Sequence, residues 1–506
     1  MNGVLPPFSL PSNVLYFHDW RYVNHGYLQW AGPEGEPMIT MPAAESLPPL
    51  HARSDSVPRG IRLETMPGDV DPEPVIRASD INEMLFFGGS VIHDQGLYRL
   101  FYESSRPGTR DPGHDKVLRY AESDDGLHWR FPELGVVEFE GRRDHNVVFT
   151  PQGTGYHGPG TFLDTHGPSE ERYKTIWLGY LTAEQLEQYR QRWPDDVDPL
   201  ACAHRAPEKR DDVAGLGICG AVSPDGLTWR QLEEPLIVQH SDTINVGAFD
   251  PLLGKYVLYP RTWYYGRRSI GRAVSDDFRH FTGLQQVIWP GPGEPATDTW
   301  YTPGYTTMPD APDHRLMFAT RWSQVDDTFS PTLHTSPDGL LWQRVPGEPM
   351  VPFGPTGSWY AAGGAVTTLV ELPGDRVGSL MQGWHVPHKH PRPLPGFGQA
   401  GWVSWPRGRL TALRADADAT FSLYPLRFRG RKLVLNFRTK ASGWIRVGVL
   451  GTDWYRKIED CEWIVGDELD HVVTWGGESD LRHTDGESLQ FTFELRNADL
   501  FSVRFE

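Results

Sequence analysis

The sequence predicts an all-β protein, a five-bladed β-propeller followed by a small C-terminal antiparallel β-sandwich. Composition is the first reason: 506 residues include 53 Gly, 44 Pro and 12% aromatic residues, which is typical of tight turns joining short aromatic-rich strands. A turn motif that recurs through the middle of the chain is the second reason. The third is period-two hydrophobicity in the C-terminal segment, which lacks that motif.

The recurring turn marks the blades. Its form is Ser-x-Asp-Gly-x-x-Trp, in which Asp-Gly supplies a tight turn and the Trp packs between sheets. Each copy follows one strand-like run and precedes another, and two more such runs stand ahead of it. Four strands in about 50 to 60 residues form one propeller blade. The four copies, the third of which has Phe in place of both Gly and Trp, begin at Ser123, Ser223, Ser275 and Ser336.

A fifth, degenerate unit follows the four copies. It begins at residues 363–368, continues through 377–383 and ends near 410–413. Residues 181–214 interrupt the second unit as an insertion with a helix-like start at 183–193, of the kind that lies on one face of a propeller. The predicted domains are an N-terminal strand and wrapping segment at 1–75, the propeller at 76–415 and the sandwich at 416–506.

Charge and the terminal sequence limit the partners. With 48 Lys and Arg against 66 Asp and Glu, the net charge of −18 argues against nucleic acid or an anionic membrane. No apolar run of about 18 residues occurs, and residues 1–16 lack a signal-peptide pattern. We therefore expect a cytoplasmic protein, although a leader that had been removed would leave no trace. The three cysteines show neither disulfide nor zinc spacing, and homo-oligomerisation stays open.

The residues just before the innermost strands are the candidate site, because these strands line the propeller axis. Acidic side chains recur at four of these entrances, and aromatic side chains accompany them. The candidates are Asp80 and Glu83 in blade 1, Asp144 and His157 in blade 2, Asp242 and Asn245 in blade 3, Asp298 and Tyr301 in blade 4, and Trp359 in blade 5.

Carboxylates beside Trp and Tyr suit cleavage of a glycosidic bond, which needs one carboxyl as general acid and another as nucleophile or base. Further candidates for sugar contact end the second strands of the blades: Arg261, Arg321, Trp322 and His385. An Arg here suits an anionic sugar, or else pairs with an entrance Asp to hold the blades together.

No metal site or cofactor is predicted. His385, His388 and His390 follow one another closely, but Pro387 between them does not let three imidazoles converge on one ion.

The blade order, the recurring turn and the C-terminal segment resemble the five-bladed glycosidase superfamily of families 32 and 43, and most closely uncharacterised bacterial family-32-like proteins. The resemblance implies that Glu83 (or Asp80) is the nucleophile or base, Asp144 a charge modulator and Asp242 the general acid. Several five-bladed relatives hold a central Ca²⁺, which the resemblance leaves open here. The motifs Asn-Asp-Pro-Asn-Gly, Arg-Asp-Pro and Glu-Cys-Pro are absent, so the substrate does not transfer.

The expected function is hydrolysis of a terminal sugar, a furanoside or fructoside first, from an oligo- or polysaccharide. Three alternatives stay open. A glycoside phosphorylase would use Arg142, Arg143 and His145 for phosphate. A sialidase-like enzyme would use Arg261, Arg321 and Tyr301, although the turn is short and the blades are five. A non-catalytic carbohydrate-binding propeller would need no catalytic acid.

Overall fold

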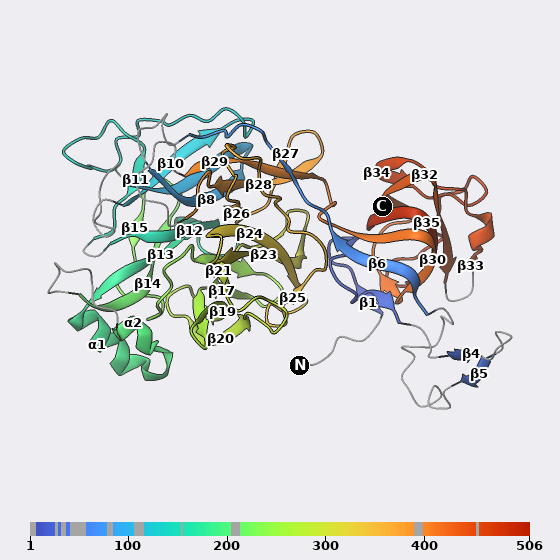
Figure 1. Cartoon of the computed structure of the whole chain (residues 1–506), viewed down its shortest axis with the longest axis horizontal. Coiled ribbons are helices and arrows are strands. Elements are labelled where there is room, and N and C mark those ends of the chain that lie inside the picture. The colour runs from blue at the N-terminus through green and yellow to red at the C-terminus, as the bar shows by residue number, and fades with distance from the viewer. Residues whose placement is uncertain are drawn as a thin grey trace. The chain divides into compact units, whose positions relative to one another are not determined.

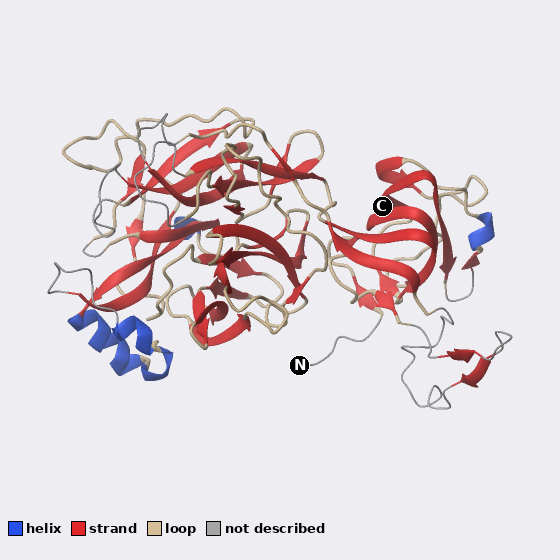
Figure 2. Cartoon of the chain, in the orientation of Figure 1, coloured by secondary structure: helices blue, strands red, loops and turns tan. Residues whose placement is uncertain are grey.

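The computed structural model describes residues 7–25, 29–31, 37–40, 57–77, 84–105, 116–152, 155–203, 213–388, 398–451 and 455–506. Strands dominate the described chain (Figure 2), which confirms the all-β class. The chain divides into two compact units. Unit 1 is Met1–Met66, Val345–Glu348 and Pro406–Glu506, and unit 2 is Pro67–Arg344 and Pro349–Trp405.

Unit 2 is the predicted five-bladed propeller, with one four- or five-stranded sheet for each blade (Figure 1). Blade 1 holds β8 (Met84–Asp94), β9 (Leu97–Ser105), β10 (Val117–Ser123) and β11 (Val147–Phe149). Blade 2 holds β12 (His157–Leu163), β13 (Tyr173–Thr182), β14 (Val213–Ser223) and β15 (Arg230–Gln231). Blade 3 holds β16 (Val246–Asp250), β17 (Lys255–Tyr259), β18 (Arg261–Tyr264), β19 (Arg267–Ser275) and β20 (Thr282–Ile288). Blade 4 holds β21 (Asp298–Thr302), β22 (Tyr305–Met308), β23 (Ala311–Ser323), β24 (Thr328–Ser336) and β25 (Gln343–Arg344).

Blade 5 draws on both ends of unit 2. It holds β26 (Gly364–Ala365), β27 (Val370–Leu372), β28 (Arg376–Gly383) and β29 (Gln399–Pro406), and its outer strand is β7 (Asp69–Val70). Since β7 precedes blade 1 in the chain, its pairing with β29 closes the ring, and the Asp71 N–H continues it by donating to Trp402 O at 2.9 Å. The predicted final strand near 410–413 was wrong, because those residues belong to a strand of unit 1.

An axial cavity of about 230 Å³ shows that the inner strands face one another. Each blade contributes to its lining, through Ser90, Thr161, Gly247, Thr306 and Thr367 among others. Hydroxyl-bearing and apolar side chains line it, and among the described lining residues none is a carboxylate, the side chain that Ca²⁺ sites usually contain.

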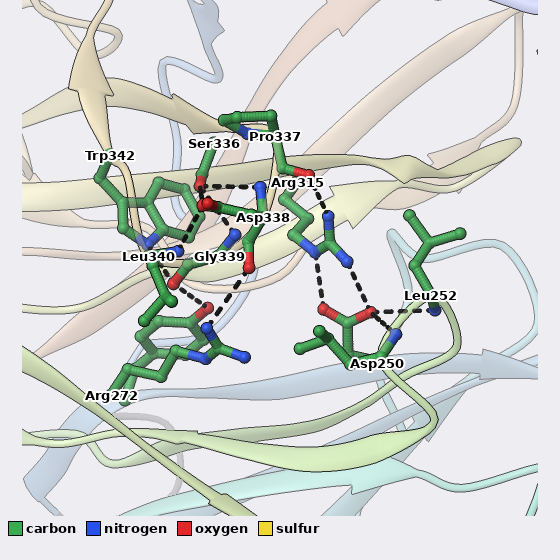
Figure 3. Close-up of polar contacts among 12 residues, drawn as sticks. Asp250, Leu252, Arg272, Arg315, Ser336, Pro337, Asp338, Gly339, Leu340 and Trp342 are labelled. Carbon is green, nitrogen blue, oxygen red and sulfur yellow. Dashed lines mark hydrogen bonds and ion pairs between the residues drawn. The ribbon is translucent and has the colours of Figure 1, made fainter. Parts of the chain in front are cut away.

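The recurring turn has the structure that its sequence predicts (Figure 3). Ser336 Oγ accepts the Gly339 N–H at 2.8 Å, and Asp338 Oδ1 accepts the N–H groups of Leu340 and Leu341. Trp342 Nε1 donates to Gly339 O at 2.9 Å, which anchors the indole ring. The glycine has φ +73°, while the third copy holds Phe278 at φ +61° in the same position. Side chain and backbone together therefore fix each blade's turn.

Buried and half-buried polar bridges join successive blades at the far ends of the inner strands. Each begins at an Asp that ends or follows an inner strand and reaches a residue in or beside the second strand of the next blade. Figure 3 shows one such bridge, in which Asp250 accepts two hydrogen bonds from Arg315, at 2.6 and 2.8 Å. The bridges are Asp94 with Arg172, Asp164 with Tyr256, and Asp250 with Arg315.

The insertion folds as predicted into α1 (Ala183–Arg192), and continues through η4 (Pro194–Asp196) and α2 (Pro199–Ala203). A capping box at Thr182 and Gln185 starts α1. Together with blade 3 the insertion lines a cavity of about 420 Å³ that reaches Trp263. The remaining helical turns are η3 (Ser169–Glu171) and η5 (Ile458–Asp460), and no helix in the described ranges has the length and apolar character needed to cross a membrane.

Unit 1 contains ten strands in one hydrogen-bonded sheet. Its longest strands, β32 (Leu433–Leu450) and β35 (Ser488–Phe505), pair along most of their length. The others are β1 (Phe8–Ser9), β2 (Val14–Tyr16), β3 (Val23–Asn24), β6 (Arg59–Thr65), β30 (Thr411–Leu423), β31 (Leu426–Arg427), β33 (Tyr455–Arg456) and β34 (Asp467–Val472). A separate pair is β4 (Gln29–Ala31) and β5 (Pro37–Thr40).

The N-terminal strands pair with C-terminal ones, β2 with β35 and β6 with β30. Those N-terminal strands therefore belong to unit 1, whereas the sequence predicts a separate wrapping segment. The reason is that they supply backbone partners to C-terminal strands, which would otherwise have exposed edges. The two-layered sandwich stays a prediction.

Candidate active site

A fully buried ion pair lies at the entrance end of the propeller. Glu103, in β9, has no exposed surface, and its Oε1 lies 2.6 Å from Lys116 Nζ, just before β10. The same oxygen lies 3.2 Å from His157 Nδ1, at the start of β12, and Oε2 accepts the Gly158 N–H at 2.7 Å. Blade 1 thus holds the first residues of blade 2 through one carboxylate.

His157 passes this contact on to Asp242. Its Nε2 lies 3.0 Å from Asp242 Oδ1, and the Asp242 side chain is 54% exposed while that of His157 is 17% exposed. The imidazole therefore joins a carboxylate that solvent cannot reach to one that solvent reaches.

Backbone geometry explains why His157 and Asp242 meet. Gly158 has φ +60°, and a Cβ atom there would lie 1.8 Å from the carbonyl oxygen of Thr243. Asn245 closes the contact, since its N–H donates to Gly158 O at 2.9 Å and its Nδ2 donates to the same oxygen at 3.2 Å. Only glycine lets the start of β12 approach the loop before β16 this closely.

The electrostatics of the three groups favour charge on each. Burial acts to raise the pKa of Asp242, but the hydrogen bond and charge of His157, together with Arg261, outweigh it and hold the pKa well below the usual range. Burial likewise acts to raise the pKa of Glu103, and Lys116 and His157 lower it overall. Burial and Lys116 act to lower the pKa of His157, but Glu103 and Asp242 raise it above its ordinary value. Asp242 is therefore an ionised carboxylate at neutral pH.

Blades 3, 4 and 5 continue the polar row from Asp242. Arg261 Nη1, at the start of β18, lies 3.9 Å from Asp242 Oδ2. Its Nη2 donates to Tyr301 O at 3.2 Å and its guanidinium stacks 4.5 Å from the centre of that ring. The Tyr301 hydroxyl lies 3.2 Å from Nε2 of His388, in the loop after β28. Side chains from all five blades thus meet in one network, in which His157, Asp242 and Tyr301 are the predicted entrance residues.

Other predicted residues have different surroundings. Asp298 is buried, and its Oδ2 lies 3.5 Å from Arg321 Nη1. This arginine therefore pairs with an entrance Asp and holds the blade together, as one of the two interpretations of the strand-end arginines predicts. Trp322 is buried, and its Nε1 donates to Asp327 at 2.9 Å. Asn245 is fully buried and holds backbone carbonyls. We therefore assign none of these four a direct role on substrate.

Trp359 is a packing residue of blade 5. It is 4% exposed, and Cβ atoms added at Gly383 or Gly401 would lie about 2.4 to 2.5 Å from its ring. Its Nε1 donates to Asp71 O, beside the closing strand β7, so it is unavailable as a sugar platform. His385 is partly buried in the loop that follows β28, and its contact with substrate stays a prediction.

The predicted position of Asp144 was wrong. It precedes β11, the outer strand of blade 1, and not the inner strand of blade 2. Its carboxylate accepts two hydrogen bonds from Arg142, at 2.9 and 2.7 Å, and is 53% exposed on the surface. Blade 2 begins only at His157, because the short strand β11 comes first and completes blade 1. The sequence pattern did not distinguish this outer strand from an inner one, which explains the error.

Asp80 and Glu83 lie outside the described residues. Glu83 directly precedes β8, the inner strand of blade 1. That strand lies beside the inner strand of blade 2, because the Thr161 N–H donates to Ser90 Oγ at 2.9 Å.

Sequence reasoning missed Glu103, Lys116 and Arg268. A signal for Glu103 exists, because this carboxylate directly follows the largely apolar strand-like run 97–102. Arg268 gives no such signal, since it follows another arginine on an ordinary hairpin.

Comparison with known proteins gives matches among solved structures alone. No family model matches the chain, and no curated protein matches it by sequence. It is similar to an N-acetylgalactosamine deacetylase from F. plautii at 14% identity, covering 68% of this chain and 95% of that one, with a TM-score of 0.43. A β-1,2-mannobiose phosphorylase from Listeria innocua gives 10% identity, 68% and 97% coverage and a TM-score of 0.42. A Bombyx mori family 32 β-fructofuranosidase is 11% identical, with 86% of this chain and 95% of that one covered, and its TM-score is 0.39.

Proposed function

We propose that this protein is a glycoside hydrolase in which Asp242 acts as an ionised carboxylate. The observation that carries the proposal is the contact of half-exposed Asp242 with His157, which the buried Glu103 and Lys116 hold in place. An ion pair that only stabilises the fold has no need of a solvent-exposed carboxylate such as Asp242, linked through a histidine to a buried carboxylate. Perturbed titrating groups gathered at one end of a pocket-forming fold are typical of catalytic sites.

The ionised state changes the role of Asp242. Glycoside hydrolysis needs one protonated carboxyl that gives its proton to the departing oxygen and one ionised carboxylate that attacks C1 or takes a proton from water. His157 and Arg261 stabilise the negative charge of Asp242, which suits the nucleophile or base and not the general acid implied by family position. The proposal assigns the general acid to Glu83, which directly precedes β8 in the chain.

The substrate of the proposal is a terminal sugar unit, with furanosides and fructosides first. The cavity of about 420 Å³ beside Trp263 supports a small-molecule ligand here, because it falls within the range of about 300 to 1,000 Å³ common for ligand sites.

Release of sugar from aryl furanosides, aryl pyranosides, fructans and arabinans tests the proposal. We expect turnover of at least one substrate by the wild type and loss of it in Asp242→Ala. Azide, a small anion that can replace a missing carboxylate, is then expected to restore turnover and to yield a glycosyl azide if Asp242 is the nucleophile. Full turnover by Asp242→Ala without azide would overturn the proposal. Binding of saccharide with no turnover of any substrate would favour the non-catalytic propeller instead.

A further inference from the structure

Two arginines lie on one face of the β18–β19 hairpin. The register pairs Trp263 with Arg268 and Arg261 with Ile270. Directly paired residues share a face, and so do residues two apart on a strand, so Arg261, Trp263 and Arg268 face the same way. The hairpin turns at Tyr265 and Gly266, both with positive φ, which fixes this register.

Aromatic rings hold both guanidinium groups in position. Arg268 lies 4.7 Å from the ring centre of Trp322, 5.3 Å from that of Tyr301 and 5.4 Å from that of Trp263. Arg261 lies over the same Tyr301 ring at 4.5 Å. Such stacking orients a guanidinium through its face and leaves the N–H groups at its edge available for a ligand.

Several of those nitrogens lack partners, although Arg261 Nη2 donates to Tyr301 O. Arg261 is 1% exposed, and its Nε is buried with no hydrogen bond. Arg268 also has a buried Nε without a partner, and none of its nitrogens makes a hydrogen bond or ion pair with any residue in the described ranges. A buried donor on a charged group destabilises the fold when it has no acceptor, so the unpaired nitrogens of these arginines are suited to a ligand that supplies acceptors.

The local charge is positive in a protein whose net charge is −18. Lys116, Arg261 and Arg268 face two carboxylates, those of Glu103 and Asp242, among the residues of the described network. The nearest of these to an arginine of the pair is Asp242, 3.9 Å from Arg261 Nη1. Burial, followed by the charge of Arg261, lowers the pKa of Arg268 and outweighs the opposing effects of Tyr301 and Asp242.

We infer that Arg261 and Arg268 form an oxyanion-binding subsite beside Asp242, with Tyr301 as its aromatic wall. Its ligand is a carboxylate, sulfate or phosphate group, which two planar guanidinium groups bind through paired hydrogen bonds. The group is carried by the saccharide or arrives as inorganic phosphate. The place of the subsite in turnover rests on the proposed function, but the binding of the anion does not.

Calorimetric titration with inorganic phosphate, sulfate and glucuronate at constant ionic strength tests the subsite, with glucose as the neutral reference. We expect at least one anion to bind the wild type, and its Kd to rise about tenfold or more in Arg268→Gln. Arg142→Gln is the matched control, since Arg142 is exposed and pairs with Asp144, and we expect it to leave the Kd unchanged. If Arg268→Gln does not fold, Arg268→Lys keeps the charge but loses the planar fork, and weaker binding is again expected.

Equal binding by wild type and Arg268→Gln, or by none of the three anions, would overturn the inference, and so would an equal loss in Arg142→Gln. Analysis of the reaction products for a sugar phosphate identifies the source of the anion. If inorganic phosphate is the ligand, turnover consumes it, because the bond from C1 to the glycosidic oxygen breaks, C1 bonds to a phosphate oxygen and the departing sugar takes the proton. If the saccharide carries the anion, glucuronate binds and the product contains no sugar phosphate.

The same titration separates this inference from the proposed function. Asp242→Asn removes a negative charge beside Arg261, so we expect it to bind the anion at least as tightly as the wild type even though turnover is lost. Anion binding without turnover of any saccharide in the wild type would therefore contradict the hydrolase and leave the subsite standing.

Discussion

His157 Nε2 lies 3.0 Å from Asp242 Oδ1, and the other ring nitrogen of His157 lies 3.2 Å from the buried carboxylate of Glu103. One imidazole thus joins a carboxylate with no exposed surface to one that is half exposed. Lys116 Nζ, which can only donate, also lies 2.5 Å from Nδ1 of the ring, so Nε2 is the nitrogen that donates to Asp242. Burial and Lys116 act to lower the pKa of His157, but Glu103 and Asp242 raise it overall, and His157 in turn lowers the pKa of Asp242.

Replacing His157 is expected to move the pH dependence of turnover. His157→Gln keeps a side-chain donor near Asp242 but removes the positive charge, so the pKa of Asp242 rises and the acidic limb of the pH–rate profile moves to higher pH. The measurement is kcat/KM against pH for wild type and variant. His280→Gln is the control, because His280 lies against Asp196 of the insertion, and its profile should match the wild type. An unmoved limb in His157→Gln would show that this histidine does not set the charge of Asp242.

Glu103→Gln is expected to destabilise the propeller, because it leaves the Lys116 ammonium buried without its carboxylate. Removing one partner of a buried ion pair costs about 3 to 5 kcal/mol. The lowered pKa of Glu103 means that its contribution is present above the unfolded pKa and is lost as the pH falls through the folded pKa. Urea unfolding at several pH values should therefore show a gap between wild type and variant that narrows in acid.

The control for Glu103 is Glu122→Gln, which breaks the more exposed contact with Arg130. An exposed pair contributes about 0 to 1 kcal/mol, so this variant should unfold close to the wild type. Equal losses in both variants would contradict the special position of Glu103.

Gly158→Ala is expected to reduce turnover without touching any charged group. An added Cβ would lie 1.8 Å from Thr243 O, so the start of β12 has to move away from the loop that carries Asp242. A displacement of about 1 Å at a reacting group can cost about 10²-fold in rate. Turnover of Gly158→Ala measured beside Gly254→Ala, whose Cβ would meet nothing within 4 Å, checks this. Wild-type turnover in Gly158→Ala would contradict the positioning role.

The bridge between blades 3 and 4 is expected to be strongly coupled. Asp250→Asn removes the carboxylate of a pair in which both residues are buried, at a cost of about 3 to 5 kcal/mol. The double variant Asp250→Leu with Arg315→Met replaces the pair by apolar side chains and should recover much of that loss. Thermal unfolding of both variants checks this, and a double variant no more stable than Asp250→Asn would contradict it.

Much of the propeller could be predicted because its signals are local. Ser336, Asp338 and Gly339 make their contacts within four residues of one another, so the turn is visible in sequence and so is its spacing. The closing strand β7 could not be predicted in this way, because two residues pair with a partner more than 300 positions away and only closure of the ring brings them together.

The site divides along the same line. His157 begins β12, Asp242 lies in the loop before β16 and Tyr301 lies in β21, so the blade-entrance positions led to these three. Arg261 was expected to end a second strand, but it begins β18 instead. Glu103 lies near the end of β9, and its role in the site depends on Lys116 and His157, which only folding brings against it. Asp144 failed for the opposite reason, since a favourable sequence position turned out to precede an outer strand.

Turnover of Asp242→Asn against Asp144→Asn tests the central claim most directly, because both changes remove one carboxylate charge and keep the side-chain shape. We predict that Asp242→Asn loses at least about 10²-fold in kcat/KM, the usual contribution of a general acid or base, while Asp144→Asn keeps wild-type turnover. Retention of more than about a tenth of wild-type turnover by Asp242→Asn, with thermal stability unchanged, would contradict the account.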